Sequence, residues 1–374
     1  MPLPSTHAPP APPAAASLFT HGGATLAYAL PAAAPRALLL VAHGCRNSGR
    51  NWFTSAPTFG SPVRSSLPEE SCVTAHALAA GFAVLAPTAS ADCWSAADLA
   101  PVEALVRAWG ASQPGVPSAL PLFAYGTSSG GYFAHLAARQ WASLAAVSMT
   151  VSAPPLAEVQ SPQPRGKAYP PLQLLYMQRD TGKAKEVKLL LETAWPGKPE
   201  VEALICAPRV VTPLYFTERA ALSSNHSSAV RAALLAAGHL KPDGHVASHP
   251  QRGAWRAAVQ GALPKRERAG LPAHSLQAAM DAVFQVLDRH KVNLTRVSIA
   301  IVSTNAISQE LDVAYGYHAA TCEHITASLA FFERHMPSRP GAAAAAAAAR
   351  PKASATAKAA PRTKKRAVVT SRRT

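Results

Sequence analysis

The chain has 374 residues and a formal net charge of +16, with 48% hydrophobic and only 15% charged residues. This length suits one large α/β domain or two modest ones, and no run of eighteen apolar residues predicts a transmembrane helix. Ten Lys and Arg and no acidic residue fall within 337–374, which leaves +6 on the preceding 336 residues. Because the basic charge is concentrated in a tail, we expect no specific nucleic-acid binding by the globular part.

The two ends of the chain have low-complexity composition. Residues 1–17 are rich in Pro and Ala and lack a basic n-region, which predicts a disordered leader and argues against a secretory signal. Residues 337–374 form an Ala/Lys/Arg-rich tail that we also expect to be disordered. Three interpretations of the tail are open: a solvated tail without a role, a nuclear-targeting stretch, or a nonspecific anchor to anionic lipid or nucleic acid.

The cysteines are few, odd in number and without a CxxC pair. They are Cys45, Cys72, Cys93, Cys206 and Cys322. Such a set predicts neither a disulfide framework nor a zinc site, and it favours a reducing, intracellular compartment. We therefore expect the cytoplasm, with the nucleus or a plastid also open.

Strand-like and helix-like segments alternate from residue 18 onward. We expect a hairpin over 18–30, strand 37–44, helix 71–81, strand 82–90, helix 96–112, strand 119–126, helix 130–142, and strands 144–151, 172–178 and 201–208. This alternation predicts an α/β fold with a mostly parallel sheet and helices on both faces. Functional residues should then follow the carboxyl ends of the strands.

One strand–helix junction carries a nucleophile motif. Gly126-Thr127-Ser128-Ser129-Gly130 fits G-x-S-x-G between a buried strand and a helix. The pattern has a mechanical reason, because a nucleophile on a sharp strand-to-helix turn leaves no room for side chains two residues to either side. Ser128 is the candidate nucleophile, and Ser129 would contribute its backbone N–H to an oxyanion hole. A glycine-rich loop with helix-capping serines is the alternative.

A second oxyanion donor is expected after an earlier strand. The segment "LLLVAHGCRN" places His43 and Gly44 directly after its strand, so the amide of Cys45 is the candidate and that of Arg46 the alternative. We interpret His43 as a packed, hydrogen-bonded residue that shapes this loop. The catalytic base comes last in the chain order Ser, acid, His.

The acid and the base should lie downstream of the serine. Asp180 is the first acidic residue after the strand in "LQLLYMQRDT", and a turn-forming Asp is the alternative. His318 stands on a Tyr-Gly-Tyr loop before the last helical pattern, which is where this architecture places its base. His324 is the second candidate, and an ordinary loop histidine is the alternative role for His318.

Taken together, these segments resemble the α/β-hydrolase superfamily over roughly residues 35–336. The segments "HGC…NWF…LPEE", "ADCWS", "GTSSGGYF", "YPPLQLLYMQRD" and "AYGYHAAT" are similar to an uncharacterised plant and green-algal branch of it. The resemblance implies the α/β-hydrolase fold and the triad Ser128, Asp180 and His318. It implies no particular substrate.

The spacing between acid and base predicts an insertion. We expect an α/β-hydrolase core at 18–209, a mostly helical cap at 210–305, and completion of the core by the His loop and last helix at 306–336. A cap over the strand ends would exclude water and limit substrate size, whereas a side-packed appendage would not. Trp52, Cys93 and Trp94, on loops after the first two buried strands, are candidate substrate-binding residues, although such residues more often pack loops.

The sequence thus predicts a serine hydrolase that cleaves an ester, thioester or amide of a small to medium acyl substrate. Neither a cofactor nor a metal is needed for this chemistry. An acyltransferase with the same triad and a non-catalytic ligand-binding protein with the same fold are the alternatives. The oligomeric state is left open.

Overall fold

A computed structural model describes residues 16–53, 67–117, 119–161, 168–198, 200–220, 222–250, 255–262 and 306–337. The strands are β1 (Ser17–His21), β2 (Ala24–Ala29), β3 (Ala37–Ala42), β4 (Phe82–Pro87), β5 (Leu122–Thr127), β6 (Leu144–Thr150), β7 (Leu172–Met177) and β8 (Val201–Cys206). The helices are α1 (Pro68–Ala79), α2 (Leu99–Ser112), α3 (Ser129–Gln140), α4 (Leu156–Gln160), α5 (Thr181–Thr193), α6 (Tyr215–Ala220), α7 (Ser224–Ala236), α8 (Trp255–Ala262), α12 (Ala306–Tyr315) and α13 (Ile325–Arg334). Two short 3₁₀ helices are η1 (Gly49–Trp52) and η2 (Ala96–Asp98).

The eight strands form one sheet in the order β1-β2-β4-β3-β5-β6-β7-β8. The first two strands form the predicted hairpin, and β2 pairs antiparallel with β4, whereas all later neighbours pair in parallel. This strand order, with a sharp turn between β5 and α3, is the α/β-hydrolase fold. The predicted α/β class and the strand-by-strand alternation are therefore confirmed.

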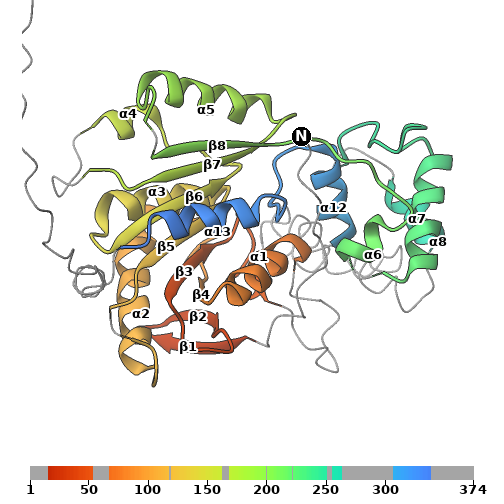
Figure 1. Ribbon diagram of the computed structural model, residues 1–374. Helices are drawn as coiled ribbons and strands as arrows, with labels where there is room; N and C mark the ends of the chain where they lie inside the picture. The colour runs from red at the N-terminus through yellow and green to blue at the C-terminus, as the bar shows by residue number, and fades with distance from the viewer. Residues whose placement is uncertain are drawn as a thin grey trace, which may run out of the picture. The chain divides into compact units, whose positions relative to one another are not determined.

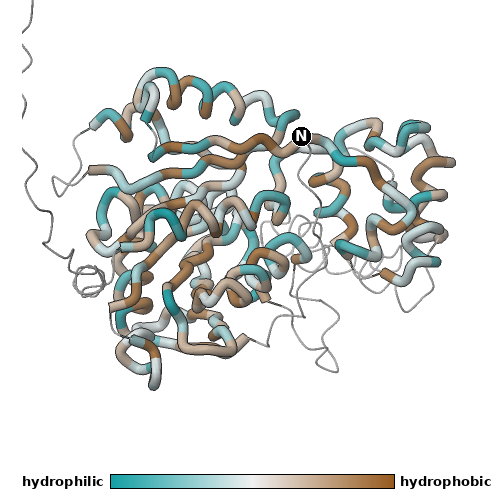
Figure 2. Tube along the Cα trace, in the orientation of Figure 1, coloured by the Kyte–Doolittle hydropathy of each residue, from teal (hydrophilic) through white to brown (hydrophobic). Residues whose placement is uncertain are grey.

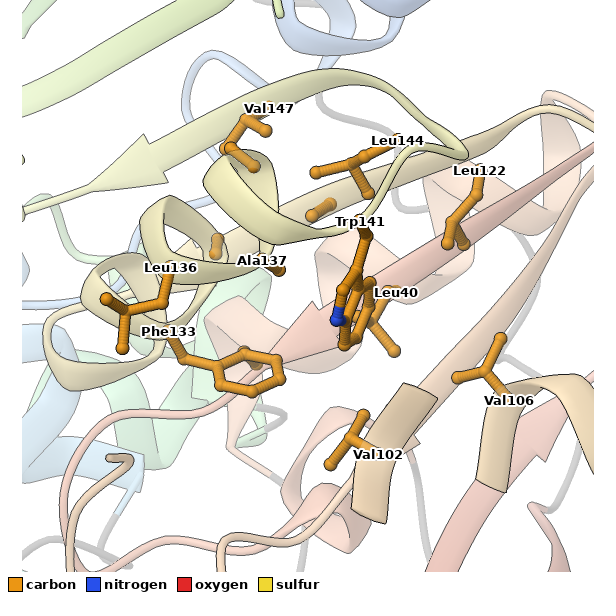
Figure 3. Packing of buried hydrophobic residues seen from close by; sticks show 14 of the residues in the cluster. Leu40, Val102, Val106, Leu122, Phe133, Leu136, Ala137, Trp141, Leu144 and Val147 are labelled. Atoms are coloured by element: carbon orange, nitrogen blue, oxygen red, sulfur yellow. The ribbon is translucent and has the colours of Figure 1, made fainter. Parts of the chain in front are cut away.

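Helices cover both faces of the sheet (Figure 1). One apolar cluster joins the strands to α2, α3 and α5, and a second cluster joins the opposite face to α1 and α13. Figure 2 shows hydrophobic residues along the central strands, as expected for strands buried on both faces, whereas the edge strands β1 and β8 are largely exposed or half-buried. Figure 3 shows Leu40 of β3 in one cluster with Val102 of α2 and the aromatic rings of Phe133 and Trp141. This packing fixes α3, and with it the start of the helix that follows the nucleophile motif.

A helical segment follows the last strand. Helices α6, α7, α8 and α12 share an apolar cluster that includes Phe216, Leu234, Trp255 and Leu311. Helix α12 begins at Ala306; its Ile307, Leu311 and Ala314 pack in this cluster, whereas Val313 packs with Met177 and Cys206 at the ends of β7 and β8. Residues 263–305 of the expected helical cap lie outside the described residues.

Two disulfides overturn the prediction of unpaired cysteines. Cys45 is bonded to Cys93, and Cys72 to Cys322. The first pair forms because β3 and β4 are parallel neighbours, so the loops that leave their carboxyl ends start side by side. The second pair joins α1 to the loop before α13. Disulfides are usual in oxidising compartments, so the cysteines no longer favour a reducing one.

The chain divides into two units, Met1–Met336 and Pro337–Thr374. Nearly all of the expected leader and tail lie outside the described residues. In the part of the chain that the structure describes, no helix is long and apolar enough to cross a membrane.

Candidate active site

Ser128 lies on a strained turn between β5 and α3. Its backbone has φ +53° and ψ −116°, a conformation that a non-glycine residue adopts only when its surroundings impose it. A Cβ on Gly126 would collide with the Gly130 carbonyl, and a Cβ on Gly130 would collide with the carbonyls of Ala42 and His43. The two glycines of the motif therefore let strand, turn and helix pack in direct backbone contact, and Ser128 stays half-buried at the edge of the sheet.

The side chains of the three candidate catalytic residues form a continuous chain of polar contacts. Ser128 Oγ lies 3.0 Å from His318 Nε2, and His318 Nδ1 lies 2.7 Å from Asp180 Oδ2. Because an ionised carboxylate only accepts hydrogen bonds, the Nδ1–H of His318 donates to Asp180 and Nε2 is left facing the serine hydroxyl. The carboxylate is buried and the imidazole is 35% exposed. This arrangement can remove a proton from Ser128 and return it to a leaving group.

Both loops that carry the acid and the base are anchored to each other and to helices. Asp180 caps the N-terminus of α5, since its Oδ1 accepts from the Lys183 N–H at 3.1 Å while Oδ2 faces His318. The N–H of Arg179 donates to the carbonyl of Gly316 at 3.0 Å. The turn-forming role considered for Asp180 and its contact with the imidazole thus coexist in one side chain, one carboxylate oxygen serving each.

The loop after β3 passes next to the nucleophile. A Cβ on Gly44 would lie 3.8 Å from Ser128 Cβ, so no side chain separates the two segments. The N–H of Arg46 donates to the carbonyl of Asp92, which argues against the Arg46 amide as oxyanion donor. Within the described part of the chain, no acceptor is assigned to the N–H of Cys45 or to that of Ser129. Two unpaired amides near a nucleophile are what an oxyanion hole requires.

His43 is a structural residue at the base of this loop. Its Nδ1 donates to the Gly44 carbonyl at 2.7 Å, and its Nε2 accepts from the Ala89 N–H at 3.1 Å. Trp94 Nε1 in turn donates to the His43 carbonyl at 2.9 Å. Burial lowers the pKa of His43 to about 4, so the neutral ring is the form that fits these contacts.

A buried cluster of charged side chains contacts the segment that follows His318, and no pattern in the sequence predicts it. The Glu69 carboxylate accepts from the Cys322 N–H and forms ion pairs with Arg219 and Arg209. Although burial opposes ionisation, these two arginines hold the pKa of Glu69 below its usual value. Arg209 also binds Glu323 at 2.7 Å. The cluster attaches the segment after His318 to α1 and α6.

Two of the three candidate substrate-binding residues belong to the core. Trp52 is fully buried and packs edge-on against Tyr125 at 5.9 Å between ring centroids, and Trp94 is buried against Phe133. Burial against the sheet leaves these indoles no surface for a substrate, so the expectation of a pocket role is corrected to loop packing. Cys93 is exposed but bonded to Cys45.

Other residues singled out in the sequence lie apart from Ser128. His324 Nε2 contacts the Ile205 carbonyl at 3.2 Å, so the second candidate for the base faces β8. A cavity of about 320 Å³ opens at the amino ends of β6 and β7, lined by Arg139, Trp141 and Tyr169 among others, and no predicted site residue lines it. The contacts between Ser128, His318 and Asp180 place the candidate site at Ser128.

Among the residues that the structure describes, two groups of side chains have the spacing of metal ligands, but neither offers a thiolate. In the group Cys72, His76 and Cys322, both sulfurs are in a disulfide. In the group Cys206, Glu323 and His324, burial raises the pKa of the Cys206 thiol to about 12, and Glu323 is paired with an arginine. These donors therefore suit neither zinc nor another thiophilic metal.

Comparison with known proteins gives similarity to solved structures alone. No protein-family model and no curated protein matches the chain. An esterase of Pyrococcus furiosus is 16% identical, with 50% of this chain and 80% of that chain covered and a TM-score of 0.35. A Thermus thermophilus protein is 21% identical, with 51% and 88% covered and a TM-score of 0.34. A dienelactone hydrolase-like phosphotriesterase from metagenomic libraries is 17% identical, with 54% and 86% covered and a TM-score of 0.31. The strand order, not these similarities, defines the fold.

Proposed function

We propose that this protein is a serine hydrolase that cleaves an ester, thioester or amide of a small to medium acyl substrate. The observation that carries the proposal is the continuous contact from Ser128 Oγ through the His318 ring to Asp180, at 3.0 and 2.7 Å. A serine hydroxyl is inert at neutral pH without a base, and a base needs an orienting carboxylate. A ligand-binding protein without catalysis would have no use for this geometry.

The reaction begins when His318 Nε2 takes the Ser128 proton as Oγ attacks the substrate carbonyl. The amides of Ser129 and Cys45 donate hydrogen bonds to the developing oxyanion, and the positive end of the α3 dipole stabilises its charge. His318 then donates the proton to the leaving group, which leaves an acyl group on Ser128. Asp180 holds the ring tautomer and stabilises the imidazolium without itself becoming protonated. A water molecule, activated by His318, releases the acid and restores the serine.

The test compares wild type, Ser128→Ala and the control Ser112→Ala for labelling by a fluorophosphonate and for hydrolysis of 4-nitrophenyl esters from acetate to laurate. Ser112 is an exposed serine at the end of α2. We expect labelling of wild type and the control, no labelling of Ser128→Ala, and a kcat for that variant lower by about 10⁴-fold or more. Equal labelling of all three would refute the proposal. Faster turnover on adding an alcohol acceptor would indicate acyl transfer instead of hydrolysis.

A further inference from the structure

The Cys45–Cys93 disulfide lies at one of the two amides assigned to the oxyanion. We propose that Cys93 is a positioning residue for the reaction: through its bond to Cys45 it holds the Cys45 amide in place for the transition state. The inference rests on the function proposed above. Cys93 itself is not assigned any contact with the substrate.

The backbone around Cys45 needs an external restraint. The next residue, Arg46, has φ +64°, a left-handed conformation that is unfavourable for a non-glycine residue. Its N–H is turned toward the carbonyl of Asp92, in the loop after β4. The loop after β3 is thus bent at Arg46, and the bend leaves the Cys45 amide without an acceptor among the described residues.

Hydrogen bonds hold the residues on either side of Cys45, and the disulfide holds Cys45 itself. On one side, the His43 ring and carbonyl contact the Ala89 N–H and the Trp94 indole. On the other, Arg46 donates to Asp92. Between them, Cys93 is covalently bonded to Cys45, the residue whose amide is assigned to the oxyanion. Each of these contacts joins the loop after β3 to the loop after β4.

A fixed amide matters more for the transition state than for the bound substrate. An oxyanion donor lowers the barrier because it is oriented before charge develops, and complete removal of one donor costs about 10²- to 10³-fold in kcat. A loosened donor must be ordered in each turnover. Breaking the disulfide should therefore lower the rate of the chemical step by about 10-fold or more while leaving binding of the acyl group nearly unchanged.

The two disulfides differ in accessibility, which provides an internal control. Cys93 is exposed and Cys45 half-buried, whereas Cys322 is only 2% exposed and Cys72 half-buried. A dithiothreitol thiolate attacks the exposed Cys93 sulfur and Cys45 leaves as a thiolate. The second thiol of the reagent then releases Cys93. Overall, the disulfide gains two electrons and two protons, and dithiothreitol is oxidised to its cyclic disulfide.

The experiment measures labelling of the full chain by a fluorophosphonate. Three quantities are determined: the rate constant at saturating probe, the probe concentration at half-saturation, and the fraction of the protein that becomes labelled. The variants are Cys93→Ser, the double variant Cys45→Ser/Cys93→Ser, and the control Cys72→Ser/Cys322→Ser. We expect both variants of the first disulfide to label at least about 10-fold more slowly, with half-saturation within about 3-fold of wild type. We expect the control to label at the wild-type rate.

A merely structural role would give a different signature, because misfolded molecules lower the labelled fraction and leave the rate constant of the remaining molecules unchanged. Should Cys93→Ser fail to fold, wild type is reduced with dithiothreitol while near-ultraviolet circular dichroism monitors its fold. We expect the same slowing, reversed on reoxidation. Labelling of the reduced protein at the wild-type rate would overturn the inference and leave the proposed function intact. No labelling of oxidised wild type would instead refute the proposed function.

Discussion

Asp180 and His318 lie 138 positions apart in the chain, yet Asp180 Oδ2 and His318 Nδ1 are 2.7 Å apart. The contact forms because Asp180 follows β7 and His318 precedes α13, and because the Arg179 N–H joins the two loops at the Gly316 carbonyl. The same carboxylate caps α5 through its other oxygen. One side chain therefore serves both the candidate site and the stability of a helix, and the two roles can be separated.

Asp180→Asn separates them. Asn caps helices about as well as Asp, so we expect the free energy of unfolding to change by less than about 0.5 kcal/mol. An amide cannot fix the required His318 tautomer, so kcat should fall by about 10⁴-fold. Asp180→Ala should lose the cap as well, at a cost of about 1 kcal/mol. Urea denaturation and ester hydrolysis on the same preparations check this prediction, and a fully active Asp180→Asn enzyme would contradict it.

Gly130→Ala tests the close packing of the turn. A Cβ there collides with main-chain carbonyls that cannot move independently, so we expect at least about 2 kcal/mol of destabilisation. The matched control is Gly110→Ala within α2, where a Cβ has nothing within 4 Å, and alanine should stabilise the helix by about 0.5–1 kcal/mol. Thermal denaturation of both variants gives the comparison. A stable Gly130→Ala protein would show that the turn is looser than described.

His43 makes stability depend on pH. Its pKa is about 4 in the folded protein against about 6.5 unfolded, so the unfolded chain binds more protons between these values. Stability should therefore rise with pH across this window, and fall by about 3 kcal/mol from pH 7 to pH 4. Since other groups titrate as well, the quantity to measure is the difference between wild type and His43→Gln. The same pH slope in both proteins would contradict the prediction.

Glu69→Gln tests the buried cluster that holds the segment after His318. The substitution removes the carboxylate that Arg209 and Arg219 share and leaves Arg219 with Glu310 at 3.8 Å and Arg209 with Glu323, so we expect a loss of about 3 kcal/mol. Glu103→Gln removes the surface pair with Arg107 and should cost less than about 0.5 kcal/mol. Chemical denaturation of both variants measures the two costs. Similar small losses would show that the cluster contributes little to holding this loop.

The order of the strands along the chain, the turn at Ser128 and the positions of Asp180 and His318 could be predicted because each has a local signature. An apolar run marks the strand, small residues mark the turn, and an acidic residue soon after a strand, here Asp180, marks the edge where parallel strands end. A loop before the last helical pattern marks His318.

Features that depend on which elements become neighbours could not be predicted. The pairing of Cys72 with Cys322 joins α1 to the loop before α13 across 250 positions of the chain, a relationship that no local pattern contains. An acidic residue in the first turn of a helix, such as Glu69, is a common local pattern, so nothing in the sequence around it indicates pairing with two arginines more than a hundred residues away. Trp52 failed as a pocket residue for the same reason, since an aromatic loop residue can face either the core or the site.

The most direct measurement is the mass of the native protein after reaction with a fluorophosphonate, followed by peptide mapping. Our account predicts one phosphonyl group per chain, located on Ser128, absent in Ser128→Ala and formed much more slowly in Asp180→Asn and His318→Ala. An unmodified wild-type protein, or a modification at any other residue, would contradict it.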